Sequence, residues 1–201
     1  MCKRHLITTT SAVLLLLFVL FLGAPETVHS SFTLMNVSID DFSPDPSTNA
    51  RVTYGLVNQV THAGAGWSVG QNCTECLAQP DPSKVFDQTW HDSSTAENGA
   101  NISFASISFT GVAVYVMGIV ISSTPRTSTS LNNSRIFFQV DGVDQGSFLF
   151  EASLGTEVVY SYNTTFFAKE DLPNGTHNVT MMCGDAEPGD SLCLLDRFIY
   201  T

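Results

Sequence analysis

Basic residues and long apolar runs are scarce in this chain. It has eight Lys and Arg residues against 19 Asp and Glu residues, and its formal net charge is −11 at pH 7. The basic residues form no cluster, so nucleic acid and anionic membrane surfaces, which attract proteins through basic patches, are not expected partners. Beyond residue 30 the longest apolar run has ten residues, at 112–121. A membrane helix needs about 20, so we expect no stable membrane insertion after this point.

The first 30 residues have the pattern of a secretory signal peptide. Lys3 and Arg4 precede eleven apolar residues at 12–22, and small residues follow up to Ser30. This order of charged, apolar and small residues predicts cleavage after Ser30, with an uncleaved anchor as the alternative. The remainder, 31–201, has the length of one domain and is expected to be secreted to the extracellular space. It would carry six basic and 18 acidic residues.

The cysteines of the mature chain predict disulfides. They are Cys73, Cys76, Cys183 and Cys193. An even number in an exported chain favours disulfides, and of the three possible pairings the local one, Cys73–Cys76 with Cys183–Cys193, is preferred. A redox or zinc site at Cys73 and Cys76 is the alternative, but no βαβ pattern surrounds them, and thiols seldom stay reduced outside the cell. We therefore expect no metal and no cofactor.

Seven N-x-S/T motifs predict N-glycosylation of a secreted protein. They begin at Asn36, Asn72, Asn101, Asn132, Asn163, Asn174 and Asn178. At four of them the Asn and the Ser/Thr share one strand face, and apolar residues occupy the other. The pattern indicates strands with a glycosylated outer face.

The chain lacks helical periodicity and alternates apolar with polar residues almost throughout. Expected strands, separated by turns rich in Pro, Gly, Asn and Asp, are Phe32–Asp40, Arg51–Val57, Val85–Trp90, Asn101–Phe109, Val112–Ile121, Arg135–Val140, Ser147–Glu151, Glu157–Phe167, Thr176–Cys183 and Leu192–Tyr200. About ten short strands predict an all-β, antiparallel sandwich or barrel. Val112–Ile121 is apolar on both faces and should be a central strand. A bulge near Ala105 would bring Phe104 and Ile107 to one face.

Two serines lie in motifs of hydrolases. Ser191 follows Gly189 and Asp190 in a GDSL motif, but no His follows it. Ser68 lies in the G-x-S-x-G sequence Gly66–Gly70, but no helix is predicted after it, as a nucleophile elbow requires. We interpret both motifs as turns or loops of a protein that is not an enzyme.

A few other residues are candidate site or structural residues. Asp40 and Asp41 could contribute to a calcium site at the end of the first strand, although no further ligands are in view. His177 is expected to hold a neighbouring loop by hydrogen bonding. Trp90 is expected in the core. Trp67, His91 and Asp92 are the candidate ligand-binding residues, because an indole can stack on a sugar and the other two can bind its hydroxyl groups.

An ordered set of short motifs resembles a known family. These are Gly66-Trp67, "TWHD" at 89–92, "FTG" at 109–111, "FFQVDG" at 137–142, "LPNGTH" at 172–177 and "LLDRFIYT" at 194–201. In this order they resemble the extracellular domain family of mushroom-forming fungi. The resemblance implies a galactose-binding-like jelly-roll whose first and last strands pair. Many members continue into a transmembrane helix and a cytoplasmic tail, whereas this sequence ends at Thr201, so we expect a secreted module and not a receptor.

The function expected from the sequence is that of a non-catalytic, glycan-binding or cell-wall-binding module. One alternative is a structural or interaction protein of the cell surface without a ligand pocket. The other is a carbohydrate-active hydrolase or esterase. Fold alone does not decide among them.

Overall fold

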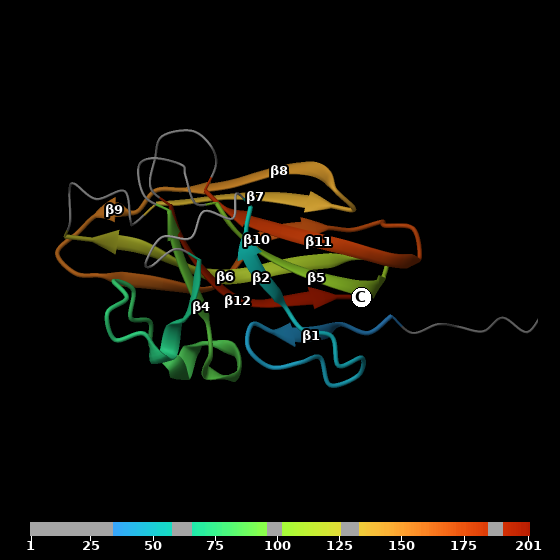
Figure 1. Cartoon of the computed structure of the whole chain (residues 1–201). Coiled ribbons are helices and arrows are strands. Elements are labelled where there is room, and N and C mark those ends of the chain that lie inside the picture. The colour runs from blue at the N-terminus through green and yellow to red at the C-terminus, as the bar shows by residue number, and fades with distance from the viewer. Residues whose placement is uncertain (1–33, 58–65, 96–101, 126–132, 185–190) are drawn as a thin grey trace, which may run out of the picture. The chain divides into compact units, whose positions relative to one another are not determined.

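Strands make up most of the described part of the chain, as Figure 1 shows for this computed structural model. The structure describes residues 34–57, 66–95, 102–125, 133–184 and 191–201. Within them no α-helix occurs, and Leu34–Thr201 form one unit. Twelve strands make two sheets. Sheet A contains β1 (Val37–Asp40), β3 (Trp67–Val69), β4 (His91–Thr95), β6 (Val114–Thr124), β9 (Ser153–Leu154), β10 (Val159–Lys169) and β12 (Ser191–Tyr200). Sheet B contains β2 (Thr53–Leu56), β5 (Ser103–Gly111), β7 (Ser134–Val140), β8 (Val143–Phe150) and β11 (Gly175–Cys183).

The strand order makes the fold an antiparallel β-sandwich of the jelly-roll, galactose-binding-like class. Sheet A runs β10-β6-β12-β4-β3, with β1 also on β12 and the short β9 on β6, and sheet B runs β2-β5-β11-β7-β8. All pairs are antiparallel except that of β6 with β9. The first and last strands pair, with Val37 opposite Tyr200, as the family resemblance implied.

The main core lies between the two sheets. Val116 and Leu195 from sheet A and Ile136 and Val179 from sheet B are among its fully buried residues. The prediction of a central strand at 112–121 is confirmed, because β6 lies between β10 and β12 and is buried along nearly its whole length. Burial of such side chains is the main source of the stability of the sandwich.

A second, smaller core covers the outer face of sheet A. Leu192 and Leu194 alternate with the inward-facing Cys193 and Leu195, so they face away from sheet B. The segment between β3 and β4, which contains three 3-10 turns at Gly70–Asn72, Pro82–Lys84 and Phe86–Gln88, packs on this face. Its anchor is Trp90, which is 2 % exposed, as expected for a core residue.

Two expectations for individual strands are wrong. The predicted strand Val85–Trp90 is mainly a 3-10 turn, because Asp87 and Gln88 adopt positive φ angles of 49° and 65° that interrupt an extended chain. The bulge expected near Ala105 is absent, since β5 pairs with β11 in unbroken register from Ser103 to Gly111. Ala105, Ile107 and Phe109 therefore face the core, and Phe104 lies on the outer face of sheet B.

Cys73, Cys76, Cys183 and Cys193 form two local disulfides, as predicted. Cys73 is bonded to Cys76 and Cys183 to Cys193, with Sγ–Sγ distances of 1.98 Å and 2.07 Å. The first closes a turn after β3, and the second links β11 of sheet B to β12 of sheet A across the sandwich. No helix among the described residues is long and apolar enough to cross a membrane.

Candidate functional site

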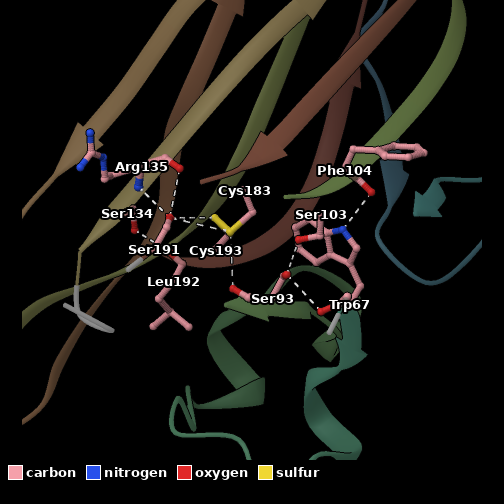
Figure 2. Close-up of a disulfide and its surroundings, with 11 residues drawn as sticks. Trp67, Ser93, Ser103, Phe104, Ser134, Arg135, Cys183, Ser191, Leu192 and Cys193 are labelled. Atoms are coloured by element: carbon pink, nitrogen blue, oxygen red, sulfur yellow. Dashed lines mark hydrogen bonds between the residues drawn. A yellow bond between two sulfur atoms is a disulfide. The ribbon is translucent and has the colours of Figure 1, made fainter. Parts of the chain in front are cut away.

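Trp67 is a structural residue of the sandwich interior. It lies on β3 and packs partly buried against the main core, with its ring 5.4 Å from that of Tyr54. Its indole Nε1–H donates to the carbonyl oxygen of Phe104 on β5 at 2.9 Å, as Figure 2 shows. The indole thus joins sheet A to sheet B, and its polar atom is not free for a ligand.

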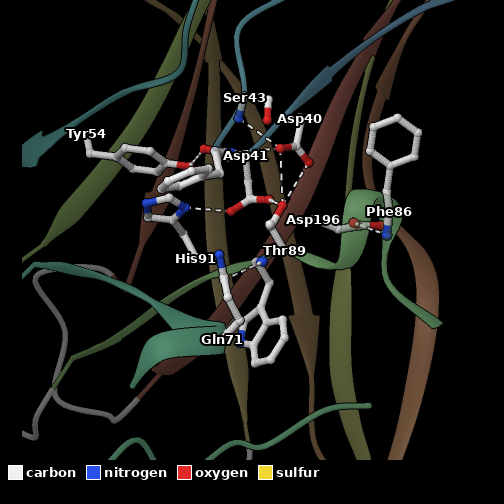
Figure 3. A network of polar contacts seen from close by, with 11 residues as sticks. Asp40, Asp41, Ser43, Tyr54, Gln71, Phe86, Thr89, His91 and Asp196 are labelled. Carbon is white, nitrogen blue, oxygen red and sulfur yellow. Dashed lines mark hydrogen bonds and ion pairs between the residues drawn. The ribbon is translucent and has the colours of Figure 1, made fainter. Parts of the chain in front are cut away.

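His91 also faces the interior, where it belongs to a polar network shown in Figure 3. Its ring stacks on Tyr54 with centroids 4.1 Å apart, and its Nδ1 lies 2.6 Å from Asp41 Oδ2. Thr89 Oγ1 donates to Asp41 Oδ1 at 2.7 Å, and the hydroxyl of Tyr54 donates to the Asp41 carbonyl oxygen. Burial raises the pKa of Asp41 to about 6, against the lowering effect of the hydrogen bonds from His91 and Thr89. The network connects the end of β1 to β4.

Asp40 and Asp41, the candidate calcium ligands, are bound within the protein. Asp40 Oδ2 accepts the backbone N–H groups of Phe42 and Ser43, and Asp41 binds His91 and Thr89. No group of three or more His, Cys, Asp or Glu residues in the described ranges could hold a metal ion. The carboxylates of Asp40 and Asp41 therefore serve to fix the chain around the end of β1.

Asp92 lies on the opposite face of β4 from His91, as strand alternation requires. There it lines a pocket of about 230 Å³ together with Ser68, Ser94 and Glu75. Ser68 is the direct partner of Asp92 in the ladder between β3 and β4. The lining also includes Leu192 and both cysteines of the first disulfide. We call this hollow the Asp92 pocket.

The carboxylate of Asp92 is buried and has no hydrogen-bond donor among the described residues. Asp92 is 6 % exposed. Burial alone raises its pKa to about 6, because the charged form loses water and gains no donor in exchange. At neutral pH an ionised carboxylate thus faces a polar pocket without a partner. In the free protein only water in the pocket can donate to it, and a ligand with suitably placed donors can replace that water.

The wall of the Asp92 pocket is held in place by two tyrosines on β10. The hydroxyl of Tyr160 accepts the backbone N–H of Gln79 at 2.7 Å, and that of Tyr162 accepts the N–H of Asp81 at 2.8 Å. The side-chain amide of Gln79 donates in turn to the carbonyl oxygens of Cys73 and Cys76. The disulfide turn beside the pocket is therefore fixed to the sheet below it.

Ser191 and Ser68, the serines of the two hydrolase motifs, have no hydrogen bond to a histidine among the described residues. Ser191 is fully buried, and its Oγ exchanges hydrogen bonds with the backbone of Arg135 beside the second disulfide, as Figure 2 shows. Ser68 is on strand β3 and not on a strand-to-helix turn. The described histidines are bound elsewhere: His91 faces the other side of sheet A from Ser68, and His177 binds Asp141.

His177 holds a loop, as expected. Its Nδ1 lies 2.7 Å from Asp141 Oδ2 and its Nε2 lies 2.7 Å from the Pro173 carbonyl oxygen. Both neighbours are acceptors, so the ring donates from both nitrogens when it is protonated, and these contacts raise its pKa. The side chain therefore ties the turn before β11 to the turn that follows β7.

The predicted glycosylation sites lie mostly on the surface where they are described. Asn36, Asn72, Asn163 and Asn174 are exposed. Asn178 is partly buried, and its Nδ2 donates to the carbonyl oxygen of Ile107 at 3.1 Å. Asn101 and Asn132 lie outside the described residues. Glycosylation of all seven stays a prediction.

A larger hollow lies on the outer face of sheet B. It has a volume of about 410 Å³, and its lining includes Phe137, Met182 and Asp144. Here the acidic group is already paired, since Asp144 Oδ1 accepts the side-chain N–H of Gln139 at 2.7 Å. We call this hollow the Phe137 groove. It is the main competitor of the Asp92 pocket as a ligand site.

The structure thus separates the three candidate residues. Trp67 and His91 lie together on the interior side of sheet A, and Asp92 lies alone on the outer side. Ser68, Ser94 and Glu75 were not predicted as site residues. The sequence holds one usable signal for Ser94, which shares the strand parity of Asp92. The positions of Ser68 and Glu75 depend on the pairing of β3 with β4 and on the disulfide turn, which no local pattern reveals.

No protein-family model and no curated protein matches this chain. Solved structures similar to it include carbohydrate-binding modules and carbohydrate-active enzyme domains. A family 35 carbohydrate binding module from Clostridium thermocellum has 10% identity and a TM-score of 0.38, covering 83% of this chain and 97% of that one. The CBM36-1 domain of a xylanase from the hindgut metagenome of Trinervitermes trinervoides has 12% identity and a TM-score of 0.37, covering 74% and 95%.

A family two carbohydrate esterase from Clostridium thermocellum is similar over part of its length, with 15% identity and a TM-score of 0.36. The match covers 74% of this chain, which spans only 31% of the esterase chain. The resemblance to the fungal extracellular family stays a prediction, since no family model matches.

Proposed function

We propose that this chain is a secreted, non-catalytic module that binds carbohydrate in the Asp92 pocket. The observation that carries the proposal is the buried carboxylate of Asp92, which faces a polar pocket without a donor. Sugar hydroxyl groups are such donors, and a carboxylate can accept from two neighbouring hydroxyls at once. A bound sugar would thereby supply the donors that the chain itself does not supply, in place of water.

The size and lining of the pocket suit one sugar residue. Its volume of about 230 Å³ is below the range of about 300–1,000 Å³ typical of sites for drug-sized ligands. The hydroxyl groups of Ser68 and Ser94 can each donate and accept, and Leu192 offers an apolar wall for the C–H face of a ring. A monosaccharide unit has hydroxyl groups and an apolar C–H face close together, and the pocket offers a partner to each.

Secretion is supported by the apolar leader at 12–22 and by two disulfides, which persist mainly in oxidising compartments. The non-catalytic role is supported by the serines, since neither Ser68 nor Ser191 has a histidine base among its described neighbours. The proposal is tested against two alternatives. One is a cell-surface protein without a ligand pocket, and the other is a hydrolase or esterase.

A glycan array with the mature, disulfide-bonded protein tests the proposal. We expect binding to at least one cell-wall or surface glycan, and a loss of about tenfold or more in affinity for Asp92→Asn. Asp144→Asn, which makes the same change of charge in the Phe137 groove, is the matched control and should bind like the wild type. If Asp144→Asn abolished binding and Asp92→Asn did not, the site would be wrong. If no glycan bound at millimolar concentration, the function would be wrong.

A further inference from the structure

Asp92 differs from every other buried aspartate in the described structure. Five aspartates are buried: Asp40, Asp41, Asp45, Asp92 and Asp196. Four of them accept hydrogen bonds from backbone N–H groups, hydroxyls, a histidine or an arginine. Asp92 alone accepts none from a described residue. The four paired carboxylates have structural roles, because residues of the chain donate to them. Asp92 has no such donor, so we interpret it as a group that binds a ligand.

The surroundings of Asp92 provide negative charge and no positive charge. The second ionisable residue of the pocket is Glu75, which is exposed at the rim. The described lining contains no Lys, Arg or His. Tyr160, which interacts electrostatically with Asp92, is a neutral phenol whose pKa is raised by burial. A ligand that brought only hydroxyl groups would satisfy the hydrogen bonds of Asp92 but leave its charge unbalanced.

We propose that the Asp92 pocket prefers sugar residues that carry a protonated amino group, such as glucosamine, over the N-acetylated or hydroxyl forms of the same sugar. This inference rests on the proposed function and names the ligand class of the same site. An ammonium group offers three N–H donors and a full counter-charge to a carboxylate. Acetylation removes the charge and adds bulk at the same atom. The ion pair would form in a largely desolvated site, where salt screens it less than at the surface.

General attraction to an acidic protein must be separated from this specific pairing. The chain has a formal net charge of −11, and any oligocation is drawn to such a surface. A variant that removes the same charge on the other sheet gives the control. Asp144→Asn changes the net charge as Asp92→Asn does, but its side chain lies in the Phe137 groove. Asn at position 144 can still accept from Gln139, so this variant is expected to fold.

The test is a calorimetric titration of the mature protein with glucosamine tetramer and with N-acetylglucosamine tetramer, at about pH 6.5 and near-physiological salt. We expect the amino form to bind about tenfold or more tightly than the acetylated form. The preference should disappear in Asp92→Asn, weaken in Glu75→Gln and persist in Asp144→Asn. Asp92→Asn removes an unpaired buried charge, so loss of binding in this variant should not come from unfolding, and circular dichroism confirms that it is folded.

The other outcomes separate this inference from the proposed function. Suppose that both tetramers, or neutral glycans on the array, bound equally well and that Asp92→Asn abolished this binding. The Asp92 pocket would then be supported as the binding site, and the preference for an amino group would be overturned. If the amino form bound more tightly but Asp92→Asn and Asp144→Asn weakened it equally, the attraction would belong to the whole surface, and the inference would again be wrong. If neither tetramer nor any array glycan bound, the proposed function would fall as well.

Discussion

Ser68 and Asp92 lie directly opposite each other on β3 and β4, and both side chains line the same pocket. Side chains at such paired positions are about 5 Å apart at Cβ, so a single sugar residue can contact both. Ser68 is exposed and Asp92 is buried. The pocket is therefore open to solvent at Ser68 and largely shielded from it at Asp92. The pairing of two short strands therefore sets one wall of the candidate site, and the disulfide turn after β3 sets another.

Stability is predicted to decrease as pH rises from about 4 to 7. Burial raises the pKa values of Asp41, Asp92 and Asp196 to about 6 in the folded state, from 3.8. A carboxyl with a raised folded pKa binds its proton more tightly when folded, so folding is penalised above that pKa and not below 3.8. The raised pKa of His177 acts in the same direction, because its contribution is complete below the unfolded pKa and is lost as pH rises through the folded one. The unfolding temperature, measured at several pH values between about 4 and 8, gives the change of stability with pH.

Asp92→Asn should reduce the decrease of stability with pH and stabilise the protein at about pH 8 by about 1–2 kcal/mol. This gain is smaller than the free energy that corresponds to the full pKa difference, because the buried amide of Asn also lacks hydrogen-bond partners. On the acid side, Asp45 has a lowered pKa and its contribution is lost as pH falls through that value. An unfolding temperature that rose steadily from about pH 4 to 8 would contradict the assignment.

Trp67→Phe is predicted to weaken the fold and to leave glycan affinity unchanged. The substitution removes the indole N–H that binds the Phe104 carbonyl oxygen and leaves a gap beside Tyr54. The expected loss is about 1–2 kcal/mol in the free energy of unfolding. Denaturant titration and the glycan array measure the two effects. A loss of affinity in a protein of unchanged stability would place Trp67 in the binding site after all.

Tyr160→Phe and Tyr162→Phe are predicted to loosen the wall of the Asp92 pocket. Each variant removes the hydroxyl that accepts one backbone N–H, from Gln79 and Asp81 respectively. The net cost of one such bond is about 1 kcal/mol. Hydrogen exchange should therefore accelerate about fivefold at the amide whose acceptor is removed, and stay unchanged in the strands of sheet B. Unchanged exchange at both amides would show that the tyrosines do not hold this segment.

Ser68→Ala and Ser191→Ala are predicted to leave any hydrolysis of aryl acetates by the purified protein unchanged. Neither serine has a described histidine within its hydrogen-bond network, so neither has a base to activate it. The measurement is release of nitrophenol by equal amounts of folded wild type and variants. Activity that disappeared in Ser68→Ala would favour the esterase alternative, with Ser68 as its nucleophile.

Alternation of residues along the chain was enough to predict most strands and the central position of β6. The failures have local physical causes. β4 was missed because its buried side chains are polar: His91 and Ser93 face the interior, where Asp41 and Ser103 bind them. The predicted strand just before it includes Asp87, whose positive φ belongs to a turn.

The candidate site was predicted only in part. Asp92 was named, but it was grouped with Trp67 and His91, which strand pairing places on the other face of sheet A. A residue's face depends on where its strand begins, and His91 begins β4 where the sequence had suggested the end of a strand. Whether a buried carboxylate has a donor depends on contacts between distant segments, so the unpaired state of Asp92 could not be predicted from the sequence.

The most direct test is to map the ligand onto the protein by amide chemical shifts during a titration with the best glycan from the array. The account predicts that the largest shifts occur at Ser68, Glu75, Asp92 and Ser94, and that they disappear in Asp92→Asn. Shifts concentrated instead at Phe137, Asp144 and Met182, across the sandwich, would contradict it.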